Sequence, residues 1–146
     1  MALTEHCYSV LLVSASDKLT ASLRDMLPCD RYDPVVVAGD VASARRCLLE
    51  NPFDLLLINT PLPDDFGTHL ALDVCNSSGT GVLLLVRAEH YPDISARVAP
   101  YGILVLSKPT NSTILTQSLT LCCATRDRLR RMEEKAATME EKMEEI

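Results

Sequence analysis

The chain has 146 residues, 47% of them hydrophobic, and carries a formal net charge of -6 at pH 7. This length suits one compact domain with a hydrophobic core and an appendage, and it excludes two full domains. The acidic balance argues against a nucleic-acid surface on these residues, because such surfaces are normally basic.

Apolar runs and helical segments alternate along the chain. Runs rich in Val and Leu predict five strands, over residues 8–13, 34–38, 55–59, 82–86 and 103–106. Helical spacing follows each run: behind the N-cap candidates Ser16 and Asp40, around residues 70–75, at 92–98 and from Thr110 onward. No strand alternates cleanly between apolar and polar residues, which indicates burial on both faces. We therefore expect a doubly wound α/β fold with a five-stranded parallel sheet between two helix layers.

Functional groups in such sheets gather beyond the carboxyl ends of the strands. Three segments near these ends carry a resemblance to a known family: Val10-Leu11-Leu12-Val13, the run Asp54-Leu55-Leu56-Leu57-Ile58-Asn59-Thr60-Pro61-Leu62-Pro63 with Gly67, and Lys108-Pro109. By their order and spacing, the chain resembles a response-regulator receiver domain of two-component signalling (CheY-like). The resemblance covers residues 7–122.

The resemblance implies five chemical roles at the strand ends. Receivers use an aspartate as phosphoacceptor, two acidic residues that hold Mg²⁺, a hydroxyl residue and a lysine. Here these positions hold Asn59, Ser14 with Ala15, Val86 and Lys108, so that only the lysine is retained. An amide is not the ionised nucleophile that a carboxylate provides, and Mg²⁺ is usually held by carboxylates. We therefore expect a degenerate pocket without phosphotransfer, metal, cofactor or catalytic residue.

Lys108 is the remaining family residue, and two interpretations of it stay open. It donates hydrogen bonds to the Asn59 side-chain oxygen and to a strand-end carbonyl, which would hold the pocket in one state without phosphate, or it is an exposed lysine. The resemblance also implies that Pro109 is often preceded by a cis peptide bond. With Val86 in place of a hydroxyl residue, the usual hydrogen-bond switch lacks its middle member.

The other side chains that could bind a metal ion or act in catalysis are expected to have structural or surface roles. Asp17 falls on the first turn of a helix, and Asp64 with Asp65 is expected to cap and solvate the helix that follows. His6, His69 and His90 are scattered and expected at the surface. The adjacent thiols Cys122 and Cys123 are expected as one packed and one partly exposed group, because a disulfide between neighbours is strained.

The cysteine pattern and the hydropathy of the sequence indicate the cellular compartment of the protein. Six cysteines without a close Cys-x-x-Cys pair favour free thiols over a zinc site or a disulfide framework. No apolar run approaches the roughly 18 residues of a membrane span. We expect a soluble cytoplasmic protein with no membrane contact.

The C-terminal segment is predicted to be one long helix. No Gly or Pro occurs after Thr110, and the residues that follow are mostly good helix formers. A helix of roughly 35 residues would be about 50 Å long. Its first part is expected to pack on the sheet through Ile114, Leu115, Leu119 and Leu121. We divide the chain into a receiver-like domain at 7–122 and a coiled-coil helix at 123–146.

A coiled-coil seam is predicted beyond the domain. Apolar residues recur at steps of three and four, at Leu129, Met132, Ala136, Met139, Met143 and Ile146. Flanking positions are charged, with a basic block before an acidic one. Parallel in-register pairing juxtaposes like blocks and antiparallel pairing neutralises them, whereas receiver geometry favours a parallel pair. A solvated single helix is the alternative.

The functional hypothesis is a signalling module that is not an enzyme. We expect a phosphorylation-independent receiver that forms a homodimer, binds a signalling partner and controls an output beyond Ile146. The resemblance favours an ANTAR-type RNA-binding antitermination domain as that output; a helix-turn-helix DNA-binding domain or no output is the alternative. A conventional receiver using another acid is a further reading. A flavodoxin-like ligand-binding protein or enzyme is a third, although no Gly-rich phosphate loop follows the first strand.

Overall fold

The computed structural model describes the backbone of residues 7–77 and 79–145 and the side chains of 7–77 and 79–140. Five strands form one sheet: β1 (Tyr8–Val13), β2 (Tyr32–Ala38), β3 (Leu55–Asn59), β4 (Gly81–Arg87) and β5 (Leu104–Lys108). Five α-helices connect and extend them: α1 (Asp17–Asp25), α2 (Val41–Glu50), α3 (Thr68–Ser77), α4 (Tyr91–Val98) and α5 (Ser112–Glu145). Short 3-10 turns flank α4 at Ala88–His90 and Ala99–Tyr101.

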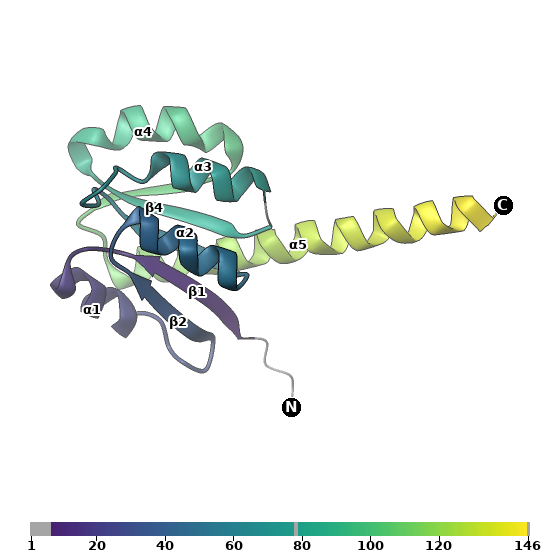
Figure 1. Ribbon diagram of the computed structural model, residues 1–146, viewed down its shortest axis with the longest axis horizontal. Coiled ribbons are helices and arrows are strands. Elements are labelled where there is room, and N and C mark those ends of the chain that lie inside the picture. The colour runs from purple at the N-terminus through teal and green to yellow at the C-terminus, as the bar shows by residue number, and fades with distance from the viewer. Residues whose placement is uncertain (1–6, 78, 146) are drawn as a thin grey trace.

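The sheet is parallel throughout and has the strand order β2-β1-β3-β4-β5. Helices α2, α3 and α4 cover one face, and α1 and α5 cover the other, so that two hydrophobic cores lie on either side of the strands (Figure 1). Every residue of β3 is buried, as expected for a central strand covered on both faces. The predicted doubly wound α/β fold is confirmed.

The two N-caps predicted from the sequence, Ser16 and Asp40, are present at the starts of α1 and α2. The Ser16 side chain accepts a hydrogen bond from the Leu19 N–H at 3.3 Å, and the Asp40 side chain accepts one from the Ser43 N–H at 2.7 Å. Helix α5 begins two residues later than expected, because Asn111 provides its cap by accepting from the Ile114 N–H at 2.9 Å.

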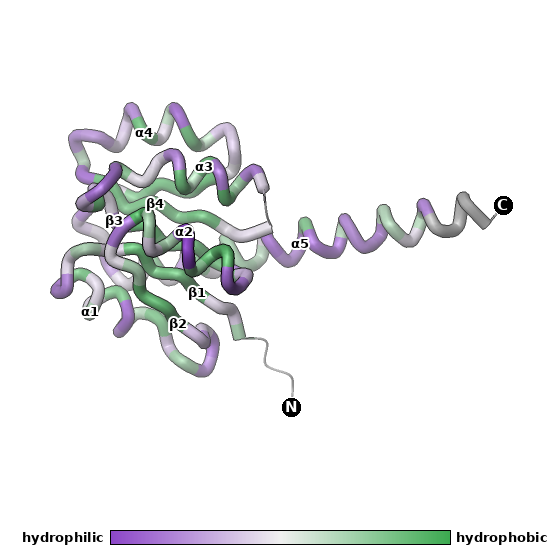
Figure 2. Tube along the Cα trace, in the orientation of Figure 1, coloured by the Kyte–Doolittle hydropathy of each residue, from purple (hydrophilic) through white to green (hydrophobic). Residues whose placement is uncertain are grey.

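Helix α5 has two parts. Residues 112–127 lie against the sheet, and residues 128–145 continue without a break beyond it; we call these the docked part and the projecting part (Figure 1). Figure 2 shows apolar positions recurring between hydrophilic ones along the projecting part. Within the described residues, no helix is both long enough and apolar enough to cross a membrane.

Two expectations for the docked part are wrong. Leu115 and Leu119 are buried as predicted, but Ile114 is 45% and Leu121 55% exposed. These two lie more than a third of a turn around the helix from the sheet-facing side, which is taken by Leu115, Leu119, Cys122 and Cys123. For the same reason Cys122 and Cys123 are both buried, at 8% and 1% exposed, where one partly exposed thiol was expected.

Candidate functional site

The carboxyl ends of the central strands bring the sequence-predicted pocket residues together. Ser14 follows β1, Asn59 ends β3, and Lys108 ends β5. Ser14 and Asn59 are buried, at 4% and 5% exposed. Because strands β1 and β3 are neighbours in the sheet, their ends place these two side chains side by side.

Asn59 bridges Ser14 and Lys108 through its amide group. The Lys108 ammonium donates to Asn59 Oδ1 at 2.8 Å, and Asn59 Nδ2 donates to Ser14 Oγ at 3.2 Å. A lysine ammonium has only donors, so it must face the oxygen of the amide and leave the NH₂ group for the serine. The Ser14 hydroxyl continues the chain by donating to the Ser16 carbonyl at 3.4 Å.

Lys108 makes a second hydrogen bond, to a backbone carbonyl. Its Nζ lies 2.6 Å from the oxygen of Thr60, a residue that is only 1% exposed. These are the two hydrogen bonds of the first interpretation, to the Asn59 side-chain oxygen and to a strand-end carbonyl. Burial, with a smaller contribution from Arg87, lowers the pKa of the Lys108 ammonium. The Lys108-Pro109 peptide bond is cis, as the resemblance implied.

Ala15 and Val86 contribute no polar group to the pocket. Ala15 is exposed, and Val86 is fully buried in the core beneath α2, α3 and α4. One hydroxyl near the pocket was not predicted from the sequence: Thr60 Oγ1 donates to the Leu85 carbonyl at 2.9 Å. The sequence feature that could have identified Thr60 is its position directly after a buried strand. Thr60 therefore ties the end of β3 to β4 and presents its carbonyl to Lys108.

The donor set at this pocket does not fit Mg²⁺. The positions that hold acidic residues in receivers supply one hydroxyl and one methyl group, and the amide oxygen of Asn59 accepts from a cation at 2.8 Å. Across the residues that the structure describes, no three His, Cys, Asp or Glu side chains are grouped as a metal site would require.

Asp64 has a different role from the expected one. Its Oδ1 accepts from the Val41 N–H at 3.0 Å and its Oδ2 from the Ala42 N–H at 3.1 Å, so it caps α2 and not the helix that follows it in sequence. These backbone N–H groups, Val41 first, lower the pKa of the Asp64 carboxyl. The neighbouring Asp65 accepts from the Phe66 N–H at 2.7 Å, within its own loop.

Gly67, part of the third-strand motif, ends this loop in a conformation that favours glycine. Its φ is +109°, and an added Cβ would lie 3.1 Å from Ile58 Cγ2. The glycine therefore lets the loop close over β3 and direct the chain into α3. His69 and His90 are exposed as expected, whereas His6 lies outside the described residues.

A second polar cluster, not predicted from the sequence, lies at the opposite edge of the sheet, where α5 leaves it. Arg126 Nη2 lies 2.6 Å from Asp54 Oδ1, and the Tyr8 hydroxyl donates to Asp127 Oδ2 at 2.7 Å. Asp54 also accepts from the Ser9 N–H at 2.9 Å. Burial, followed by the hydrogen bond to Asp127, raises the pKa of Tyr8 to about 12.

No model of a protein family matches the sequence, and no curated protein matches it. Solved structures do match. A signal receiver domain of an HD domain-containing protein from Pseudomonas fluorescens Pf-5 aligns with a TM-score of 0.77 and 22% identity, covering 90% of this chain and 96% of that one. The chemotaxis response regulator CheY4 of Vibrio cholerae aligns at 0.69 and 21% identity, covering 80% and 99%.

A third similar structure is an adenylate cyclase from Rhodopirellula baltica. It aligns with a TM-score of 0.80 and 18% identity, covering 90% of this chain and 98% of that one. At these identities the likeness shows the fold alone, which is the flavodoxin-like fold of CheY-type receiver domains.

Proposed function

We propose that this chain is a receiver-type signalling module that works without phosphorylation. The observation that carries the proposal is the Lys108–Asn59–Ser14 network, with its bonds of 2.8 and 3.2 Å. It occupies the place where receivers, by the resemblance, carry phosphoacceptor, metal ligands and lysine. The network satisfies the buried polar groups of that place with the chain's own atoms.

The chemistry of the pocket supports a single fixed state. Asn59 lacks the ionised oxygen that attacks phosphorus in acyl phosphate formation. The Lys108 ammonium is bound to two oxygens of the chain itself. Val86 has no hydroxyl with which to follow a phosphoryl group. We infer that the signal comes instead from binding of a protein or ligand.

Dimerisation through α5 is the second part of the proposal. Leu129, Met132 and Met139 are 55%, 60% and 65% exposed on the projecting part, and Ala136 is exposed between them. Apolar side chains at this spacing are typical of a coiled-coil seam. Of the other two seam residues, the Met143 side chain and the whole of Ile146 lie outside the described residues.

The output is proposed from the resemblance alone. A receiver followed by such a helix is similar to regulators that end in an ANTAR-type RNA-binding antitermination domain. In that arrangement, RNA contacts come from the output domain and not from these acidic residues. Reading the coding sequence beyond Ile146 tests this part, and a DNA-binding domain there would overturn it.

The test of the central proposal is incubation with acetyl phosphate and Mg²⁺, followed by intact mass measurement. We expect no addition of about 80 Da to the chain. The variant S14D/A15D/N59D is the matched control, because it restores the missing carboxylates on the same fold. An adduct on the unmodified chain contradicts the proposal, and peptide mapping would then show whether Asp17, Asp64 or Asp65 carries it.

We propose binding, and not catalysis, as the activity. The rival interpretation comes from the likeness to the adenylate cyclase structure, since a similar fold can carry different functions. Incubation of the chain with ATP and a divalent cation, followed by chromatography, separates the two. Formation of cyclic AMP above the background of a heat-denatured sample would overturn the proposal.

A further inference from the structure

The exposed Ile, Leu and Met side chains of α5 lie on one face of the helix, together with Ala136. At about 100° per residue, these positions fall within about 80° of one another around the helix axis. We call them the α5 stripe: Ile114, Leu121, Leu129, Met132, Ala136 and Met139. The stripe runs for roughly 40 Å, so it joins the docked part and the projecting part.

The α5 stripe is separate from the side of the helix that packs on the sheet. Leu115, Leu119 and Cys122 face the core, about a quarter-turn away from the stripe. Where α5 leaves the sheet, the stripe borders a hollow of about 310 Å³ to which Leu121, Leu129 and Leu104 contribute. Ile114 and Leu121 extend the exposed apolar face onto the domain, at the heptad position that Arg128 and Lys135 take farther along the helix, and Thr125 lies between Leu121 and Leu129.

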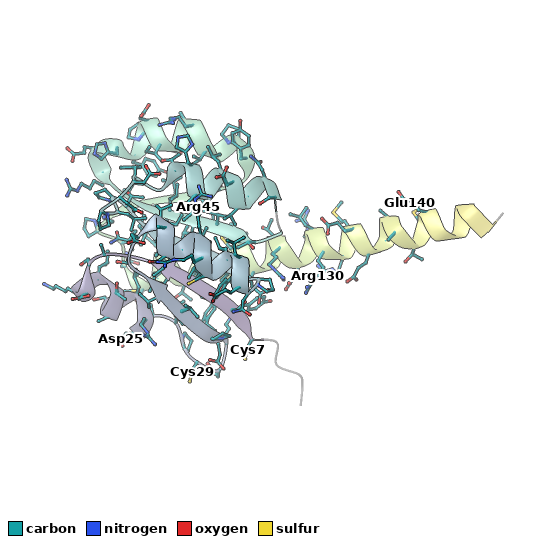
Figure 3. All side chains as sticks on the ribbon, in the orientation of Figure 1. Cys7, Asp25, Cys29, Arg45, Arg130 and Glu140 are labelled. Atoms are coloured by element: carbon teal, nitrogen blue, oxygen red, sulfur yellow. The ribbon has the colours of Figure 1, made fainter. Side chains whose placement is uncertain are left out.

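Charged residues flank the α5 stripe with opposite signs on its two sides. Arg128 and Lys135 lie about 70° to one side of the centre of the stripe, and Glu133 and Glu140 about 70° to the other. All four are exposed, and Figure 3 shows Glu140 pointing away from the helix into solvent. The helix thus has one basic flank and one acidic flank beside a common apolar stripe.

We propose that the α5 stripe binds the same stripe of a second copy of this chain, with the two helices parallel and in register. In a parallel pair, the two-fold axis brings the basic flank of one helix against the acidic flank of the other. Arg128 then faces the partner's Glu133, and Lys135 faces the partner's Glu140. An antiparallel pair places basic against basic and acidic against acidic. This inference rests on the dimer of the proposed function and adds its orientation and extent.

The blocks of charge along the sequence do not oppose this orientation. Arg126 forms an ion pair with Asp54 and is only 12% exposed, so its charge is compensated within the domain. Arg130 and Glu134 lie on the side of the helix away from the stripe, and Figure 3 shows Arg130 extending into solvent. Only charges beside the stripe come close enough to a partner helix to select its direction.

The sign of the effect of Glu133→Lys on the dimer distinguishes the orientations. In the parallel pair it places Lys against the partner's Arg128, and we expect the dissociation constant to rise about tenfold at low salt. In an antiparallel pair it relieves repulsion from the partner's Glu140, so that the dissociation constant falls. The double variant R128E/E133K restores the parallel pairs, and we expect it to return to within about threefold of the parent.

Glu134→Lys is the matched control, since it makes the same charge change on the opposite face of the same turn. Sedimentation equilibrium of the full chain measures each constant, and circular dichroism checks that each variant is folded. We expect no change for E134K. Tighter dimers for E133K would overturn the orientation while leaving the dimer intact. A parent chain that stays monomeric at tens of micromolar would instead overturn the dimer itself.

Leu121→Gln tests whether the interface extends onto the domain. We expect this variant to weaken the dimer by about tenfold, because Leu121 is 55% exposed in the single chain and covered in the pair. Thr120→Gln places the same side chain on the opposite face and is expected to leave the dimer unchanged. If L121Q dimerises as tightly as the parent, the interface begins only at Leu129 and the proposed extent is wrong.

Discussion

Asp54 and Arg126 form an ion pair of 2.6 Å at the point where α5 leaves the sheet, and both side chains are largely buried, at 16% and 12% exposed. Asp54 precedes β3 and also accepts from the backbone N–H of Ser9 at the start of β1. The pair thus joins the final helix to two central strands. Arg126 Nε and Nη1 make no hydrogen bond, and Nη1 lies 3.5 Å from Asp127 Oδ1, so Asp54 is the nearer and main acceptor for this guanidinium.

The first prediction concerns this pair. Asp54→Ala leaves the buried Arg126 guanidinium with the Asp127 carboxylate, 3.5 Å from Nη1, as its ion-pair partner, and we expect a loss of about 3 kcal/mol in the free energy of unfolding. Arg126→Met should cost less, about 1–2 kcal/mol, because Asp54 keeps the hydrogen bonds from Ser9. Urea unfolding measures both. Equal losses, or a larger one for R126M, would contradict the assignment of Asp54 as the main acceptor.

The second prediction concerns Lys108. Lys108→Ala removes the donor for Asn59 Oδ1 and for the Thr60 carbonyl, both in buried residues, and we expect a loss of about 1–3 kcal/mol in unfolding free energy. Lys18→Ala, on the exposed surface of α1, is the control and should change stability by less than about 0.5 kcal/mol. Similar values for the two variants would show that the network contributes nothing to the fold.

The third prediction is a pH dependence from Asp64. Capping of α2 lowers its pKa below the ordinary value of 3.8, so its contribution to stability is present above pH 3.8 and is lost as the pH falls through the lower, folded-state value. Asp64→Asn lacks this titration. We expect the difference in melting temperature between parent and variant to be largest near neutral pH and to shrink below about pH 4. A difference that stays constant down to about pH 2 would be inconsistent with the cap.

The fourth prediction concerns thiol reactivity. Cys7 and Cys29 are exposed, and Figure 3 places both near the start of β1. Burial raises the pKa of Cys122 to about 12 and that of Cys123 to about 11, which keeps both as unreactive thiols near neutral pH. We expect iodoacetamide to modify Cys7 and Cys29 rapidly, and Cys122 and Cys123 only in urea. Peptide mapping after a short exposure checks this, and early labelling of Cys123 would show that α5 detaches from the sheet.

Much of the fold could be predicted because its signals are local. Buried strands are continuous apolar runs, so β1 and β3 match their predicted bounds. Parallel strands bring their carboxyl ends to one edge, which made the Lys108–Asn59 bond one of the two interpretations of Lys108. The Asp54–Arg126 pair has no such signal, since each residue alone resembles a surface charge. The cap by Asp64 was assigned to the wrong helix because its partners lie 23 and 22 residues earlier in the chain.

The burial of α5 was also harder to predict than its presence. Composition and the lack of Gly or Pro identify a long helix, whereas the face that meets the sheet depends on the rotation of the helix about its axis. Leu115 and Leu121 have equal hydropathy and share the docked part, yet one is buried and the other is 55% exposed. Only the position of the neighbouring strands decides between them.

Because α5 continues unbroken past Arg126, a small tilt of its docked part would produce a larger displacement at its free end. The ion pair to Asp54 lies close to the point where the helix leaves the sheet, so any tilt of the docked part would move the free end about this point. The segment from Arg126 to Glu145 measures roughly 30 Å at 1.5 Å per residue, so a tilt of about 5° in the docked part displaces the far end by about 2.5 Å. A small rearrangement where a partner touches the domain would therefore be magnified at the tip of the helix.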